Sequence, residues 1–183
     1  MKNLKITTLA LVAILAFSSC TKDDTPPVNE EEVITTVTTT LTNGSNIITL
    51  ESRDLDGDGP NAPVITVSGK LATNTTYTGA VTILNETESP AGDITSEVEE
   101  EGEEHQLFFQ APSIGAFVYT DKDINNNPIG LKFTLRTENA ATGDLVVTLR
   151  HLPNKSASGV ASGDITNAGG ATDFVITYPL EVQ

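Results

Sequence analysis

The sequence predicts an all-β protein, an antiparallel immunoglobulin-like β-sandwich of about nine strands. From Val33 onward, β-branched Val, Ile and Thr dominate, and these residues favour strands over helices. Gly, Asn, Asp and Pro interrupt the chain about every ten residues, as turns between short strands do. Apolar and polar residues also alternate along several segments, which is typical of a strand with one buried face and one solvated face.

The clearest alternation is at 131–137, where Leu131, Phe133 and Leu135 share one face. Asn43-Gly44 favours a tight hairpin between the first two strands, and Pro179 favours an edge position for the last strand. The stretches 97–104 and 153–170 are expected to be loops because they are rich in Glu or in small and polar residues. The nine expected strands are 33–41, 46–52, 63–69, 76–84, 105–110, 117–121, 131–137, 145–151 and 174–182.

Composition excludes several function classes. The 183 residues fit one modest domain, and a net charge of −15 with only ten Lys and Arg argues against nucleic-acid binding. A single Cys and no Trp exclude both an internal disulfide and a true immunoglobulin domain. No apolar run reaches the roughly 18 residues of a membrane-spanning helix. The sequence carries no nucleophile elbow, Walker loop, dinucleotide fingerprint or HExxH motif, so we expect no enzyme.

The first residues have the three parts of a secretory signal. Lys2 and Lys5 precede an apolar stretch at 6–17, and two small residues come just before Cys20. The segment 15–20 resembles a bacterial lipobox, in which the Cys thiol is acylated and becomes the new N-terminus. The sequence therefore predicts a signal peptide at 1–19, lipidation at Cys20, an acidic flexible tether at 20–32 and a sandwich domain at 33–183.

The residues after Cys20 carry a second resemblance. Lys22, Asp23 and Asp24 form a Cys-x-Lys-Asp-Asp motif that resembles the export signal of Bacteroidetes surface lipoproteins. Small flavobacterial lipoproteins of this kind are encoded near TonB-dependent receptors and are sometimes labelled as periplasmic-binding-fold proteins. The resemblance implies an outer-membrane, surface-exposed location and a role in uptake with such a receptor as partner. The fold label does not fit, because that fold needs alternating strands and helices over a longer chain.

One candidate cation site is an Asp-rich loop. Asp54, Asp56 and Asp58 have the D-x-D-x-D-G spacing that surrounds a hard cation such as Ca²⁺ with carboxylates. The twelfth position is Ile65 rather than Glu, which excludes an EF-hand. An Asx-turn between two strands is the competing interpretation.

A second candidate site joins the two histidines. His105 shares a strand face with Leu107, and His151 shares one with Leu149. An up-and-down strand order would bring His105 and His151 to the same end of the sandwich. Glu103 falls on the face of His105 if the strand extends, which would complete a three-ligand site for Zn²⁺ or another transition metal. Two unrelated polar residues at strand ends are the competing interpretation.

Two roles follow from these observations. One is capture of a metal or another small ligand for TonB-dependent uptake, and the other is a structural or adhesive surface module with no small ligand. The two are separated by whether the protein binds a metal ion or a small molecule.

Overall fold

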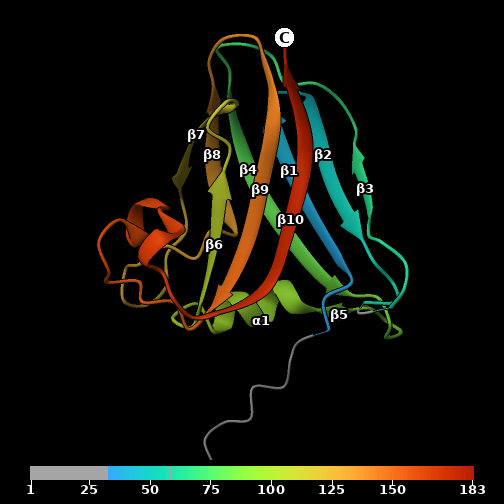
Figure 1. Ribbon diagram of the computed structural model, residues 1–183, viewed down its shortest axis with the longest axis vertical. Helices are drawn as coiled ribbons and strands as arrows, with labels where there is room; N and C mark the ends of the chain where they lie inside the picture. The colour runs from blue at the N-terminus through green and yellow to red at the C-terminus, as the bar shows by residue number, and fades with distance from the viewer. Residues whose placement is uncertain (1–32, 58) are drawn as a thin grey trace, which may run out of the picture. The chain divides into compact units, whose positions relative to one another are not determined.

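The computed structural model describes residues 33–57 and 59–183, which form two antiparallel β-sheets (Figure 1). The larger sheet has the order β3-β2-β1-β4-β8-β7, with β5 paired to β4 off this path, and the smaller has the order β10-β9-β6. The larger sheet contains β1 (Thr36–Asn43), β2 (Asn46–Arg53), β3 (Val64–Val67), β4 (Thr76–Asn85), β5 (Gly92–Asp93), β7 (Gly115–Tyr119) and β8 (Lys132–Thr137). The smaller contains β6 (His105–Gln110), β9 (Ala141–His151) and β10 (Ala171–Val182).

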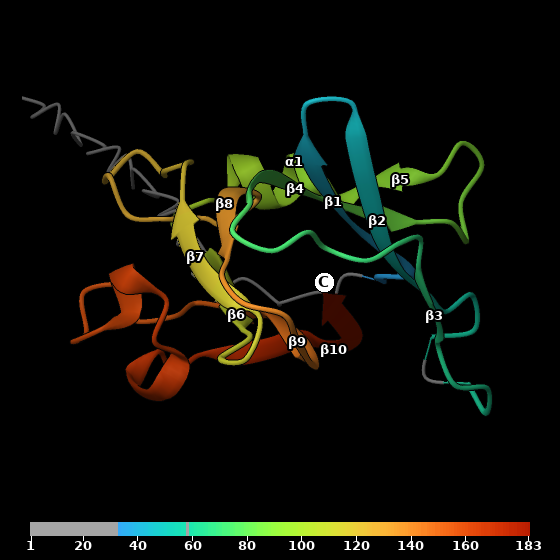
Figure 2. The same ribbon diagram turned by 90° about the horizontal axis from the view of Figure 1, so that it is seen from above.

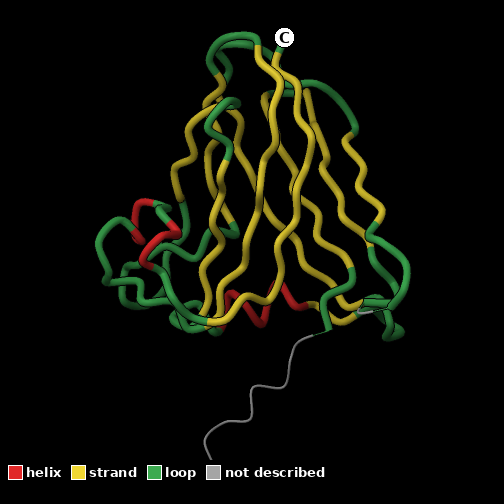
Figure 3. Tube along the Cα trace, viewed as in Figure 1, coloured by secondary structure: helices red, strands yellow, loops and turns green. Residues whose placement is uncertain are grey.

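The all-β prediction is confirmed, since strands dominate the described residues (Figure 3). All nine expected strands are present, and β5 is an additional short strand. The predicted hairpin joins β1 and β2, where Asn43 pairs with Asn46 and Gly44 takes a φ of +58°. The strand that holds Pro179 ends the order of the smaller sheet, as expected. The immunoglobulin-like identity within this class stays a prediction.

The core lies between the inner faces of the two sheets. The ring of Phe109 on β6 lies 4.3 Å from that of Phe133 on β8. Gly79 on β4 makes room for Phe133, since a Cβ there would lie 2.2 Å from that ring. The Tyr178 hydroxyl of β10 donates to the carbonyl of Val37 on β1 at 3.1 Å. Each buried aromatic or aliphatic side chain stabilises the fold by about 1.5–3 kcal/mol, so the smaller sheet is held firmly against the larger one.

A helix replaces part of the loop expected at 97–104. α1 (Ile94–Glu100) is capped at its N-terminus by Asp93, whose side chain accepts from the backbone N–H of Ser96 at 3.3 Å and from its hydroxyl at 2.7 Å. Ile94 and Val98 are buried, one helical turn apart on the same face. The loop prediction was therefore wrong for 97–100, because N-capping and two buried side chains outweigh the acidic composition.

The segment between β9 and β10 is a loop, as predicted for 153–170, with two short 3-10 helices. These are η1 (Val160–Ser162) and η2 (Ile165–Asn167). Val160 and Ala168 pack on Phe108, which points away from the main core, and together they form a second small core. Figure 2 shows this segment beside β6. No helix among the described residues is long and apolar enough to cross a membrane.

Candidate metal centre

The two histidines meet at one end of the smaller sheet. β6 begins at His105 and β9 ends at His151, and the two residues are direct partners in the antiparallel register. Their ring centroids lie 4.7 Å apart with a tilt of 58°. The sequence-based prediction that His105 and His151 share one end of the sandwich and one face is confirmed. In Figure 1 this end of β6 and β9 lies at the bottom, close to α1.

Asp173 joins the histidines as a third member, and a β-bulge places it there. Ala171 pairs with His151 and Phe174 pairs with Leu149, so β10 advances three residues over a stretch in which β9 advances two. One residue of β10 is therefore extra. In a regular strand, Asp173 would alternate with Phe174 and point away from the core face. An extra residue in a bulge breaks this alternation and redirects a side chain, so the carboxylate lies on the same side as the imidazoles.

The three side chains form the one cluster of metal-ligating groups found among residues 33–57 and 59–183. One ligand atom from each of His105, His151 and Asp173 lies within 4.8 Å of the other two. Zinc bonds to nitrogen and oxygen are about 2.0–2.2 Å, which puts two ligands of a tetrahedral site about 3.3 Å apart. Side-chain rotations that bring the atoms up to about 1.5 Å closer would therefore complete the geometry.

His105 has one ring nitrogen in use and one free for a ligand bond. Its side chain is 0% exposed, and Nδ1 lies 3.3 Å from the carbonyl oxygen of Glu101, to which it can donate its proton. Nε2 is buried and has no hydrogen-bond partner. Burial lowers the pKa of His105, which favours the neutral imidazole. In metal-binding histidines one ring nitrogen usually donates to a backbone carbonyl or carboxylate while the other binds the metal, and His105 has the first of these contacts.

Asp173 also has an unpaired oxygen. Its Oδ2 atom is buried without a hydrogen-bond partner. Burial raises the pKa of Asp173, while the nearby His105, His151 and Arg150 act in the opposite direction. Two buried polar atoms without partners in one cluster cost free energy that a shared cation would recover.

The solvent side of the cluster is acidic. The Glu104 carboxylate lies 3.6 Å from Nε2 of His151, and the Glu101 carboxylate lies 4.0 Å from Nδ1 of His105. Both Glu side chains are more than half exposed, whereas the His151 side chain is 14% exposed. The negative potential of these carboxylates attracts divalent cations to the cluster.

Glu103, the third ligand expected from the sequence, lies elsewhere. Its carboxylate accepts from the side-chain amide of Asn125, and it does not belong to the cluster. The strand begins only at His105, so the alternation that placed Glu103 on the face of His105 does not reach back to it. Asp173 was not predicted from the sequence, because it alternates with Phe174 and regular alternation would place its side chain on the outer face of the strand. The one available sign was the pair Gly169-Gly170 just before the strand, since glycines there can mark irregular pairing.

The carboxylates of Asp54 and Asp56 in the Asp-rich loop accept hydrogen bonds from groups of the same loop. Asp54 accepts from the N–H of Asp56 at 3.3 Å, and Asp56 accepts from the Asn61 side chain at 2.6 Å. The hydrogen bond from Asn61 lowers the pKa of Asp56. These contacts are those of an Asx-turn loop. Asp58 lies outside the described residues, so the calcium hypothesis stays a prediction. Cys20, Lys22, Asp23 and Asp24 also lie outside them.

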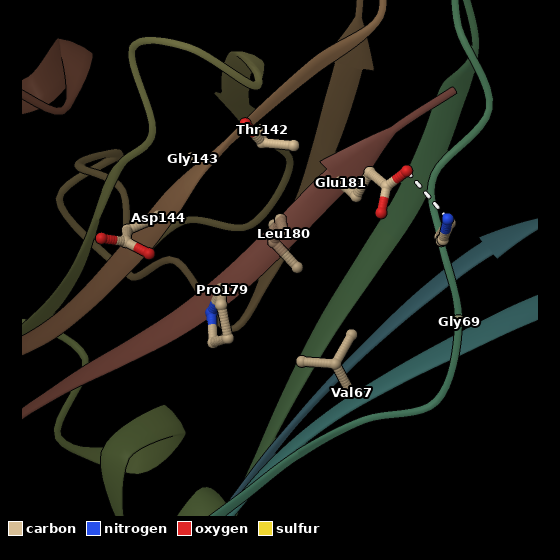
Figure 4. Close-up of a pocket in the computed structure, with 9 residues that line it drawn as sticks. Val67, Gly69, Thr142, Gly143, Asp144, Pro179, Leu180 and Glu181 are labelled. Atoms are coloured by element: carbon tan, nitrogen blue, oxygen red, sulfur yellow. Dashed lines mark hydrogen bonds and ion pairs between the residues drawn. The ribbon is translucent and has the colours of Figure 1, made fainter.

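An open groove of about 620 Å³ lies at the other ends of β9 and β10 (Figure 4). Gly143, Asp144 and Pro179 line it, and the ion pair between Lys70 and Glu181, 2.8 Å long, crosses one side. It has no residue in common with the histidine cluster.

Comparison of the chain with protein-family models, with curated proteins and with solved structures finds no match.

Proposed function

We propose that this protein is a lipid-anchored binding protein of the outer membrane that captures a divalent transition-metal ion, such as Zn²⁺, for TonB-dependent uptake. The single observation that carries the metal-binding role is the meeting of His105, His151 and Asp173, with a buried unpaired atom on two of the three. The anchor and the uptake role rest on the lipobox around Cys20 and on the Cys-x-Lys-Asp-Asp resemblance.

The chemistry of the cluster favours a borderline cation. Imidazole nitrogen suits Zn²⁺, Cu²⁺, Fe²⁺ and Ni²⁺, whereas Ca²⁺ and Mg²⁺ prefer an all-oxygen site. Three protein ligands leave a fourth position for water or for a ligand that arrives with the metal. A site that is partly open to solvent and surrounded by carboxylates suits capture and release, so the proposed role is binding rather than catalysis.

Calorimetric titration of the purified protein with Zn²⁺ tests this role. We expect one ion per chain in the wild type, and a loss of binding in His151→Ala and in Asp173→Asn. Asp173→Asn keeps the size of the side chain and removes the charged ligand. Glu103→Gln is the matched control, since it makes the same chemical change at a carboxylate outside the cluster.

The outcomes separate the alternatives. Equal binding in the wild type, Asp173→Asn and His151→Ala would refute the cluster as the site. Binding lost in Glu103→Gln but kept in Asp173→Asn would restore the ligand set expected from the sequence. No binding of Zn²⁺, Cu²⁺, Ni²⁺ or Co²⁺ by the wild type would favour the structural or adhesive module instead.

A further inference from the structure

Lys155 is a buried cation close to the proposed metal centre. Its side chain is 5% exposed, and its ammonium group contacts three acceptors from two other segments of the chain. Nζ donates to the Asp123 carboxylate at 3.0 Å, to the Pro128 carbonyl at 2.9 Å and to the Gly102 carbonyl. An ammonium group has three N–H donors, so every donor of Lys155 is used.

The contact with Gly102 fixes the turn that orients both histidines. Gly102 follows Glu101, whose carbonyl accepts from His105. The same turn ends at Glu104, whose carboxylate faces His151 and whose carbonyl accepts from the N–H of Leu152 at 2.6 Å. A shift of this turn would therefore move the carbonyl that accepts from His105 and the carboxylate that faces His151.

The contacts with Asp123 and Pro128 fix the loop between β7 and β8 to the same point. The next residue, Ile129, accepts from the N–H of Leu107 on β6 at 2.7 Å. Asp123 is itself held by the N–H groups of Asn125 at 2.9 Å and Asn127 at 2.8 Å. The loop that binds the ammonium group is thus held by its own hydrogen bonds and is hydrogen-bonded to β6, the strand that begins at His105.

Lys155 also belongs to the loop that connects two of the three ligands. This loop leaves β9 after His151 and enters β10 just before Asp173. Lys155 is four residues after His151, so its ammonium group anchors this loop near the site. One side chain therefore joins the 101–104 turn, the loop between β7 and β8 and the loop between β9 and β10.

We infer that Lys155 is the positioning residue of the metal centre, which holds the 101–104 turn and the 152–170 loop so that His105, His151 and Asp173 converge on one cation. This inference rests on the proposed metal site. Groups hydrogen-bonded to metal ligands typically change metal affinity about 10- to 100-fold when they are removed, and Lys155 holds the turn that contains such a group, the Glu101 carbonyl. A buried ion pair is by contrast weak evidence for a purely stabilising role, because burial of both charges opposes their attraction.

The test is the Zn²⁺ affinity of Lys155→Met/Asp123→Asn, a double variant that removes the pair without leaving a buried unpaired charge. We expect its Zn²⁺ dissociation constant to rise about 10- to 100-fold. The Co²⁺ absorption spectrum should change as well, since its d–d bands report the geometry of the ligands. Leu50→Ala on β2 is the control, because it creates a cavity in the main core outside the three site strands. If the double variant does not fold, Lys155→Met alone is measured in the same way, since Asp123 then keeps its hydrogen bonds from the N–H groups of Asn125 and Asn127.

The outcomes are distinct for the site and for the positioning role. A wild type that binds no Zn²⁺ overturns the metal site and this inference with it. A wild type that binds Zn²⁺ while the pair variant has the same affinity and the same Co²⁺ spectrum overturns the inference alone. An equal loss of affinity in Leu50→Ala also overturns it, because general destabilisation would then explain the effect. Weaker binding and an altered spectrum in the pair variant alone support it.

Discussion

At the scale of single residues, burial favours the neutral form of His105, and a neutral imidazole is the form that can bind a cation. Its buried ring has lost its water, and burial is the main reason why its pKa lies below the ordinary value. The charged and titratable groups that face it are His151 from β9, Asp173 from β10 and Glu101 from the turn after α1. His151 adds to the lowering, while Asp173 and Glu101 oppose it.

This pKa predicts how the metal-free protein responds to acid. Because the pKa of His105 is lowered on folding, the unfolded chain binds its proton first as the pH falls, and stability decreases from about pH 6.5 downward. His105→Gln removes this contribution, so its melting temperature should fall less than that of the wild type between pH 7.5 and pH 5. Thermal unfolding monitored by circular dichroism at several pH values measures both curves. Parallel curves for the two proteins would contradict the prediction.

Asp173 shows how the irregular pairing of one strand decides which residue joins the candidate cluster. The residues of β10 from Phe174 onward alternate regularly, and this phase alone would leave Asp173 on the outer face. The extra residue of the bulge reverses the direction of the carboxylate without disturbing the pairs that follow. Edge strands tolerate such bulges, and β10 ends the order of its sheet.

Deletion of Thr172 tests the role of the bulge. The shorter strand should pair Asp173 with Arg150 on the outer face and keep Phe174 opposite Leu149. We expect the fold to persist and Zn²⁺ binding to be lost, as measured by calorimetry and circular dichroism. Thr172→Ala is the control, since it removes only the contact of the hydroxyl with Arg150 and keeps the register. Full Zn²⁺ affinity in the deletion variant would show that the bulge does not place the ligand.

At the scale of the whole molecule, the negative charge fits the proposed capture of a cation. The net charge of −15 attracts cations over the whole molecule, and the exposed Glu101 and Glu104 concentrate this effect beside the cluster. The core packing of β6, β9 and β10 keeps these strands in register, and this register holds the three side chains of the cluster together at the strand ends. The lipid proposed at Cys20 would hold this domain at the membrane.

Cys20→Ala tests the anchor. Acylation requires the thiol, so we expect the variant to lose palmitate labelling and to leave the outer-membrane fraction. The measurement is metabolic labelling with palmitate together with membrane fractionation of cells. Ser19→Ala is a suitable control, because it keeps a small residue before Cys20. A labelled Cys20→Ala variant in the outer membrane would refute the lipoprotein interpretation.

The sequence alone determined the fold class and two thirds of the candidate site. Alternation with a period of two is a local property, so it predicted the strands of Leu107 and Leu149 and the phase of both histidines. An antiparallel strand order then brought His105 and His151 to one end. Helix α1 was missed because its capping Asp93 and its buried Ile94 and Val98 lie in a stretch dominated by Glu.

Only the tertiary structure revealed the third candidate ligand, Asp173, and the contacts of Lys155 that support the proposed site. Asp173 reaches the histidines through a bulge, and a bulge depends on how two strands pair rather than on the residues of either one. Lys155, Asp123 and Gly102 are far apart in the sequence, and their contact exists because three separate segments end at one place. Periodicity relates residues within one segment of the chain, whereas a metal centre is formed by residues that are close in space. The sequence pattern therefore predicted the two histidines correctly, but it indicated Glu103 as their third partner instead of Asp173.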